Sequence, residues 1–400
     1  MPSACIAFAN GCPRARVNAA FLFSYFEANG WSIRQSLREA DLVLVFTCGV
    51  NHRSEKKALR LLSIANRQRA ATSRLVVLGC LPGINPAALG NGFNALLVPP
   101  LELDTLDDII DAKIPISQID DINTIKPRID EAQSCFNMLD RFVSEFEASK
   151  VFLHRVRDKL RPKRSAFSEE DMFVIRIANG CLDECSYCAV RFAHGSLRSK
   201  DTQKVLREFQ KGIGERREDF AVVAGDIGAY GQDISTNILE LLRKMFACKA
   251  PFRLHMTEFN PRWFLRYQAG LIDLLAANRD RIAGLIFPVQ SGSTRILELM
   301  RRGYSVAAAS QCLRQLRRAI PELPVHTHVM VGFPGETDAD FSDTLRFLHD
   351  ARFDEIEVYK YEDRPGTKAS QMANKIAGHR KSSRMLRIFK EFSGIARPAL

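Results

Sequence analysis

The 400-residue sequence lacks the segments that would place it in a membrane or on a secretion route. No apolar run reaches the length of about 20 residues needed to cross a bilayer. The N-terminus has no basic segment followed by an apolar stretch and a cleavage site. We therefore expect a cytoplasmic protein without a membrane partner. With 46% hydrophobic and 26% charged residues, the chain is typical of a globular protein of two domains, or one large domain with an appendage.

The sequence also lacks a disulfide framework, because its ten cysteines are few for so long a chain. Paired C-x2-C units, which zinc sites with four ligands favour, are missing as well. Instead, Cys181, Cys185 and Cys188 form one C-x3-C-x2-C motif. Thiolates hold iron-sulfur clusters, and three ligands for four irons leave one iron open to chemistry. The motif therefore predicts an iron-sulfur site in a reducing compartment.

A second set of three cysteines is spread over the first 80 residues. Cys12, Cys48 and Cys80 each follow a run that we predict to be a strand, at residues 5–9, 41–47 and 75–79. Helical patterns between these runs predict a doubly wound parallel sheet. Functional groups of such sheets collect beyond the carboxyl ends of the strands. We therefore expect these cysteines to meet there and hold a second cluster, against the alternative of three unrelated core cysteines.

The second half of the chain alternates strand and helix patterns again. Strands are predicted at residues 173–178, 220–224, 252–257, 282–289, 325–331 and 355–361. This alternation predicts a partial (β/α)6 parallel barrel with its active site at the carboxyl-terminal rim. The fold class is therefore α/β. We predict a cluster domain at 1–111, a helical linker or insertion at 112–168, the barrel at 169–370 and a basic helical tail at 371–400.

The cysteine motif, with Tyr187 before its last cysteine and a predicted strand before the loop, resembles that of radical S-adenosylmethionine (SAM) enzymes. The resemblance implies that SAM binds the open iron and yields a 5'-deoxyadenosyl radical, which takes hydrogen from an unactivated carbon. It also implies SAM contacts from Tyr187 near the adenine, Arg198 near the carboxylate, Asp226 near the amino group and Gln290 at the rim. No catalytic residue is assigned beyond the cluster ligands. A flavodoxin or ferredoxin is the expected electron donor.

Further motifs resemble one branch of that superfamily, the methylthiotransferases. They lie at residues 11–12, 47–48, 79–80, 195–199, 226–233, 290–293, 332–337 and 364–367, and so span nearly the whole chain in order. The resemblance implies that Cys12, Cys48 and Cys80 carry an auxiliary 4Fe-4S cluster, so that the protein holds two clusters. It further implies transfer of a methylthio group to an unactivated C–H bond.

The departures from this family concern the substrate. Ile286 replaces a usual histidine, His328 a usual aspartate and Glu362 a frequent serine. We also expect the family's C-terminal TRAM domain to be missing. We therefore expect a peptide or protein substrate, such as a ribosomally made natural-product precursor. A tRNA substrate is the alternative, and the formal charge of +11 suits either. Two further alternatives are sulfur insertion or dehydrogenation without methyl transfer, and a non-catalytic iron-sulfur sensor.

Overall fold

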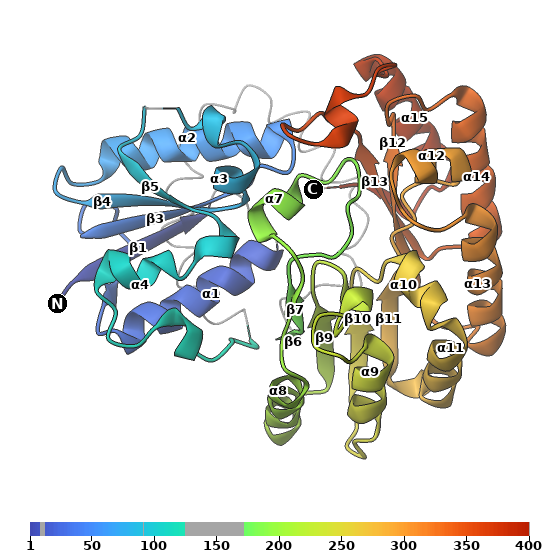
Figure 1. Ribbon diagram of the computed structural model, residues 1–400, viewed down its shortest axis with the longest axis horizontal. Coiled ribbons are helices and arrows are strands. Elements are labelled where there is room, and N and C mark those ends of the chain that lie inside the picture. Colours follow the sequence, from blue (N-terminus) through green and yellow to red (C-terminus); the bar gives the residue numbers. More distant parts are fainter. Residues whose placement is uncertain (9–12, 91, 125–171, 400) are drawn as a thin grey trace.

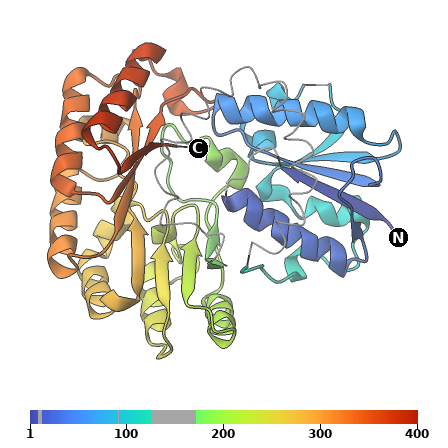
Figure 2. The same cartoon turned by 180° about the vertical axis from the view of Figure 1, so that it is seen from behind.

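The computed structural model describes residues 1–8, 13–90, 92–124 and 172–399, without the side chains of residues 13–16. Cys12 and most of the predicted linker at 112–168 therefore lie outside the described residues. Two α/β bodies lie side by side, with a short helix, α7, between them (Figures 1 and 2). Within the described residues, no helix is both long and apolar enough to cross a bilayer.

The N-terminal body is built on a five-stranded parallel sheet in the order β2-β1-β3-β4-β5. Its strands are β1 (Ser3–Phe8), β2 (Ser32–Ile33), β3 (Leu42–Thr47), β4 (Arg74–Gly79) and β5 (Ala95–Val98). Its helices are α1 (Pro13–Ala28), α2 (His52–Gln68), α3 (Cys80–Ile84) and α4 (Thr105–Ile110).

Helices cover both faces of this sheet because side chains alternate along each strand. Ile6 and Phe8 of β1 pack in a cluster with α1 and α4. Cys5 and Ala7 point to the other face and pack in a cluster with α2. The predicted doubly wound parallel sheet is thus confirmed.

The C-terminal body is a seven-stranded parallel sheet in the order β14-β13-β12-β11-β10-β9-β6, beside a two-stranded ribbon of β7 and β8. Its strands are β6 (Phe173–Arg176), β7 (Ala178–Asn179), β8 (Arg198–Ser199), β9 (Asp219–Val223), β10 (Arg253–Met256), β11 (Ile282–Ile286), β12 (Val325–Val331), β13 (Glu355–Lys360) and β14 (Ala396–Pro398). Its helices are α7 (Val190–His194), α8 (Thr202–Gly214), α9 (Ile238–Phe246), α10 (Pro261–Arg266), α11 (Gln268–Ala277), α12 (Thr294–Leu299), α13 (Val306–Ala319), α14 (Asp338–Ala351) and α15 (Gly378–Glu391).

The six predicted barrel strands are all present, and one more was not predicted. The predicted tail at 371–400 contains the basic helix α15, but it also contains β14, which pairs with β13. The partial barrel therefore ends in a strand rather than in the helix alone. Alternation along β12 puts Val325, Val329 and Val331 against the helices, while His326 and His328 face the other way and pair with Glu355 and Glu357 of β13.

Several contacts join the two bodies at separate places. Val17 of α1 packs against Met172, Val174 and Ala221 of the barrel. Arg176 of β6 donates a hydrogen bond to Asn18 at 2.8 Å. At a third place, Arg364 forms an ion pair with Glu55 of α2.

The third of these contacts is buried, since the Arg364 side chain is only 3% exposed. Glu55 also accepts from Asn85 at 3.0 Å, and the Arg364 guanidinium holds the pKa of Glu55 below its usual value although burial opposes this. The rim of the barrel is thereby held against the helix that follows β3.

Candidate functional site

The C-x3-C-x2-C motif forms a loop between β7 and α7. Gly180 begins the loop with φ +70°, and a Cβ there would lie 2.0 Å from the carbonyl oxygen of Ser196. Gly225, after β9, is equally confined, because its Cβ would lie 2.4 Å from the Gly180 oxygen. Only glycine permits this approach of two backbones. The approach brings the Asp226 loop against Cys181.

Two of the three sulfurs accept hydrogen bonds from nearby groups. Arg302 is buried and donates from Nη1 to Cys185 Sγ at 3.3 Å. The same side chain donates to Asn260 Oδ1 at 3.1 Å and to the Pro288 oxygen at 2.9 Å. The backbone N–H of Asp183 donates to Cys181 Sγ at 3.4 Å. Such donors stabilise ligand sulfurs of iron-sulfur clusters.

The loop offers three thiolates, the kind of ligand that holds an iron-sulfur cluster. No three His, Cys, Asp or Glu side chains in the described part of the chain stand close enough to bind a single metal ion. The thiolates of a four-iron cluster each bind a different iron, so they need not converge on one point. Burial raises the pKa of Cys181 to about 12, and a coordinated metal overcomes this because a coordinating thiol is deprotonated outright.

Asp226 carries a buried oxygen that no described residue hydrogen-bonds. Its Oδ1 accepts from the backbone N–H groups of Gly228 at 2.9 Å and Asn260 at 3.3 Å. Its Oδ2 has no hydrogen-bond partner among the described residues. Burial, with a smaller contribution from Asp183, raises the pKa of Asp226 to about 7. A buried carboxylate oxygen that lacks a donor fits an ammonium group, such as that of SAM.

The other three residues predicted to contact SAM lie in the cysteine loop, after β11 and on β8. Tyr187 packs against a small core cluster that includes Met300 and Tyr361. Gln290 follows β11 with φ +68°, and its backbone N–H bonds the His328 oxygen at 2.7 Å, so it sits at the barrel rim. Arg198 is exposed on β8, paired with Asn179 of β7. The SAM contacts of these residues stay predictions.

The second set of cysteines begins at the predicted edge of the N-terminal sheet. Thr47 of β3 is paired with Gly79 of β4, and Cys48 and Cys80 follow directly. A Cβ at Gly79, which has φ +94°, would lie 2.3 Å from the Thr47 oxygen, so glycine is needed there. Cys12, the third predicted ligand, lies outside the described residues.

The two cysteine segments touch through α3 and α7. A Cβ at Gly83 of α3 would lie 2.6 Å from the Ala193 Cα of α7. The ring of His194, the last residue of α7, places Nε2 at 3.5 Å from Cys80 Sγ. The helix that follows Cys188 therefore packs on the helix that Cys80 begins.

Sequence reasoning did not single out three residues of this site: Arg302 as a sulfur donor, Asn260 and His194. Arg302 lies a short way downstream of the motif at residues 290–293, which is the signal that the sequence offers for it. Asn260 links the loops, since its side chain bonds Asp183 and its backbone bonds Asp226.

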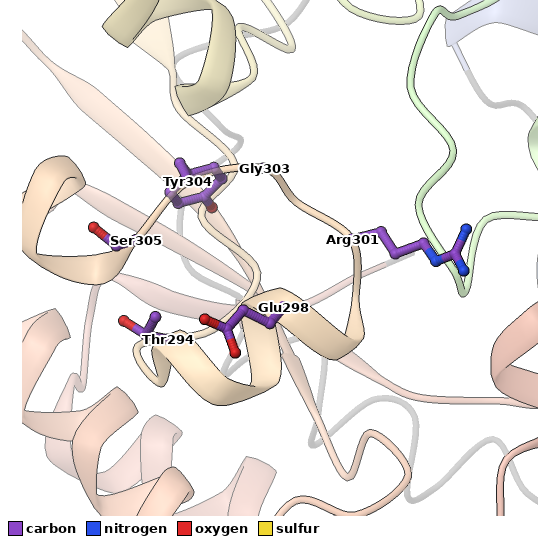
Figure 3. A pocket seen from close by; sticks show the side chains of 6 residues that line it. All are labelled: Thr294, Glu298, Arg301, Gly303, Tyr304 and Ser305. Carbon is purple, nitrogen blue, oxygen red and sulfur yellow. The ribbon is translucent and has the colours of Figure 1, made fainter.

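A groove on the barrel is lined by none of the predicted cluster or SAM ligands. It has a volume of about 480 Å³ and is lined by Thr294, Glu298, Arg301, Gly303, Tyr304 and Ser305. Arg301 extends from it toward the cysteine loop (Figure 3), where its Nη1 lies 3.8 Å from the Glu184 carboxylate. None of the lining residues is a predicted ligand, so the groove itself is not assigned a role.

Known proteins resemble the two bodies separately and the chain as a whole. A family model described as the radical SAM superfamily matches residues 175–348, and one described as uncharacterized protein family UPF0004 matches residues 5–98. A probable threonylcarbamoyladenosine tRNA methylthiotransferase of Pyrococcus horikoshii is 29% identical over 90% of this chain and 77% of its own. The ribosomal protein uS12 methylthiotransferase RimO of Protochlamydia amoebophila is 27% identical over 95% and 74%.

A solved structure shares the fold. The radical S-adenosylmethionine methyltransferase TsrM of Kitasatospora setae, with cobalamin and a [4Fe-4S] cluster bound, has a TM-score of 0.62 at 14% identity. The likeness covers 92% of this chain and 77% of TsrM. At this identity it shows the fold alone.

The barrel with its three-cysteine loop is that of a radical SAM protein. Together with the N-terminal domain and the relatives, it supports the radical SAM methylthiotransferase family. The protein is an enzyme that transfers a sulfur-containing group, and it uses SAM and 4Fe-4S clusters.

Proposed function

We propose that the enzyme attaches a methylthio group to an unactivated carbon of transfer RNA. The observation that carries the reaction is the contact of α3 with α7, because it brings the segments of both cysteine sets together. Proximity of this kind replaces a chance encounter of short-lived species. The P. horikoshii relative, named for tRNA, and the formal charge of +11 support the choice of substrate.

The residues divide between two sites. Cys181, Cys185 and Cys188 would hold one cluster, and Cys48 and Cys80 the auxiliary cluster together with Cys12. When bound, the first cluster and SAM supply the radical that removes a substrate hydrogen, while the auxiliary cluster supplies a place for sulfur. The proposed auxiliary domain is 1–111 and the proposed barrel domain 169–370.

Asp226 is the residue whose geometry best supports a SAM contact. Its unpaired Oδ2 would accept from the SAM ammonium group, and that positive charge would lower the carboxyl pKa and keep the group ionised. Tyr187 near the adenine, Arg198 near the carboxylate and Gln290 at the rim complete the proposed set.

A peptide or protein substrate is the second candidate. The RimO relative, named for ribosomal protein uS12, supports it. Binding of the enzyme to bulk tRNA and to ribosomal protein uS12, each measured at 50 and 200 mM salt, separates the two. The tRNA proposal predicts tight binding that falls steeply with salt. Weak binding of tRNA together with salt-tolerant binding of uS12 would refute the tRNA proposal and favour a protein substrate.

The reaction is tested by product mass and by two cysteine variants. A gain equal to S–CH3 supports methylthiolation, whereas a gain of sulfur alone or a loss of two hydrogens supports the alternatives without methyl transfer. Cys181→Ala should abolish SAM cleavage. Cys48→Ala should leave cleavage and stop sulfur transfer, so methylthiolated product from this variant would refute the auxiliary site.

The proposed reaction requires two clusters, an electron donor and a reducing compartment. Anaerobic reconstitution should give about eight irons per chain, and about four would leave only the radical site. A flavodoxin or ferredoxin is the proposed electron donor, and the cytoplasm is the proposed compartment because thiols stay reduced there.

A further inference from the structure

One short segment contacts both cysteine sites. The helix α7 starts two residues after Cys188 and ends at His194, whose Nε2 lies 3.5 Å from Cys80 Sγ. The next residue, Gly195, accepts a hydrogen bond through its backbone oxygen from the backbone N–H of Cys181 at 3.3 Å. Of these two adjacent residues, His194 therefore contacts a predicted ligand of the auxiliary cluster and Gly195 contacts a predicted ligand of the other cluster.

Packing fixes this segment in place. Gly195 has φ +69°, and a Cβ there would lie 2.9 Å from Cδ1 of Leu101, so the N-terminal body closes over it. On the other side Gly83 leaves no space between α3 and Ala193. The imidazole of His194 cannot leave Cys80 by a shift of the helix without opening both contacts.

We propose that His194 is a positioning residue of the auxiliary site, which donates a hydrogen bond from Nε2–H to the sulfur of Cys80. The inference rests on the auxiliary cluster of the proposed function. A hydrogen bond to a ligand sulfur stabilises the more negative, reduced state of a cluster and so raises its reduction potential. It also fixes the direction of the sulfur, because the donor comes from the barrel while the cysteine comes from the N-terminal sheet.

The experiment isolates the auxiliary cluster in the full-length chain. Cys181, Cys185 and Cys188 are replaced together by alanine, so that only the auxiliary site can be reconstituted. His194→Leu, which removes the donor, and His194→Gln, which keeps an N–H donor, are made in this parent. His379→Leu, at an exposed position of α15, is the matched control. The measurements are iron and sulfide content and a reductive titration followed by electron paramagnetic resonance.

The expected result is a lower reduction potential in His194→Leu and a value near the parent in His194→Gln and His379→Leu. We expect about a tenfold change in the one-electron equilibrium, which corresponds to about 59 mV. Loss of the cluster in His194→Leu with recovery in His194→Gln would support the same role.

Two results would overturn the inference. One is an unchanged potential in a fully loaded His194→Leu. The other is loss of the cluster in both His194 variants, which would make His194 a ligand rather than a donor to Cys80. A parent that holds no cluster would instead refute the auxiliary site itself, and the role of His194 with it.

Discussion

Replacing Asp226 by asparagine should stabilise the metal-free protein more at high pH than at low pH. Asp226 is 3% exposed, and burial followed by Asp183 raises the pKa of its carboxyl from 3.8 to about 7. The folded state therefore holds the proton more tightly than the unfolded state. For such a group the stability is fully present below about pH 4 and is lost as the pH rises to about 7.

The size of the effect follows from the shift. One pKa unit is worth about 1.4 kcal/mol, so a shift of about three units costs the folded protein about 4 kcal/mol at pH 8. Between pH 5 and pH 7, a range of two pH units, this cost to the folded protein grows by about 3 kcal/mol. Asparagine keeps the oxygen that accepts from Gly228 and Asn260. Its NH2 group takes the place of Oδ2, for which the described residues offer no hydrogen-bond partner, so a buried polar group stays unsatisfied at a cost. That penalty is about 1–3 kcal/mol and is the same at every pH.

The assay is urea unfolding of metal-free, full-length protein at pH 5, 6, 7 and 8 and constant ionic strength. The difference in unfolding free energy between Asp226→Asn and the wild type contains the constant penalty at every pH, so the change of this difference with pH reports the titration alone. Asp273→Asn, at an exposed position of α11, is the control. A difference between Asp226→Asn and the wild type that does not change with pH would refute the reasoning.

The remaining predictions concern SAM and the contacts between the two bodies. With both clusters loaded, Asp226→Asn should weaken SAM binding by about tenfold or more, because a hydrogen bond to a charged group is worth about 1.5–3 kcal/mol; anaerobic calorimetry measures this, and unchanged affinity would remove Asp226 from the site. Gly83→Ala should cost about 1–3 kcal/mol in urea unfolding because its Cβ meets the backbone of Ala193, whereas Gly214→Ala, with open space around it, should cost far less. Arg364→Met should cost about 3–5 kcal/mol because it leaves Glu55 without its partner, and adding Glu55→Leu should recover part of that loss; equal costs in the single and double variants would count against the ion pair.

Most of the fold was predictable because the chain repeats one pattern. The strands of both sheets are apolar runs bounded by turns, and helices of the right length separate them. Among the described residues, three strands were missed, β2, β8 and β14, which are two or three residues long. Such short segments carry no period of their own, and only their pairing with β1, β7 and β13 makes them strands.

Part of the site could likewise be predicted from neighbouring residues, whereas the rest depends on contacts between residues far apart in the sequence. Cys181, Cys185 and Cys188 share one loop, so their spacing alone indicates the chemistry. Arg302 and His194 reach sulfurs that are 117 and 114 residues away in sequence. A lone arginine or histidine carries no trace of such a partner, so only the three-dimensional packing reveals these contacts.

The spacing of the two cysteine sites is a property of the fold rather than of the groups that they bind. The bodies are attached through Gly83 and Ala193, through Arg176 and Asn18, and through Arg364 and Glu55. A hinge motion that separated the sites would have to leave the buried charge of Arg364 without its partner, at a cost of several kcal/mol. It would also withdraw His194 from Cys80. Because each attachment uses different elements, breaking one leaves the other two to resist the motion, and a substrate must reach a pair of sites whose distance is already set.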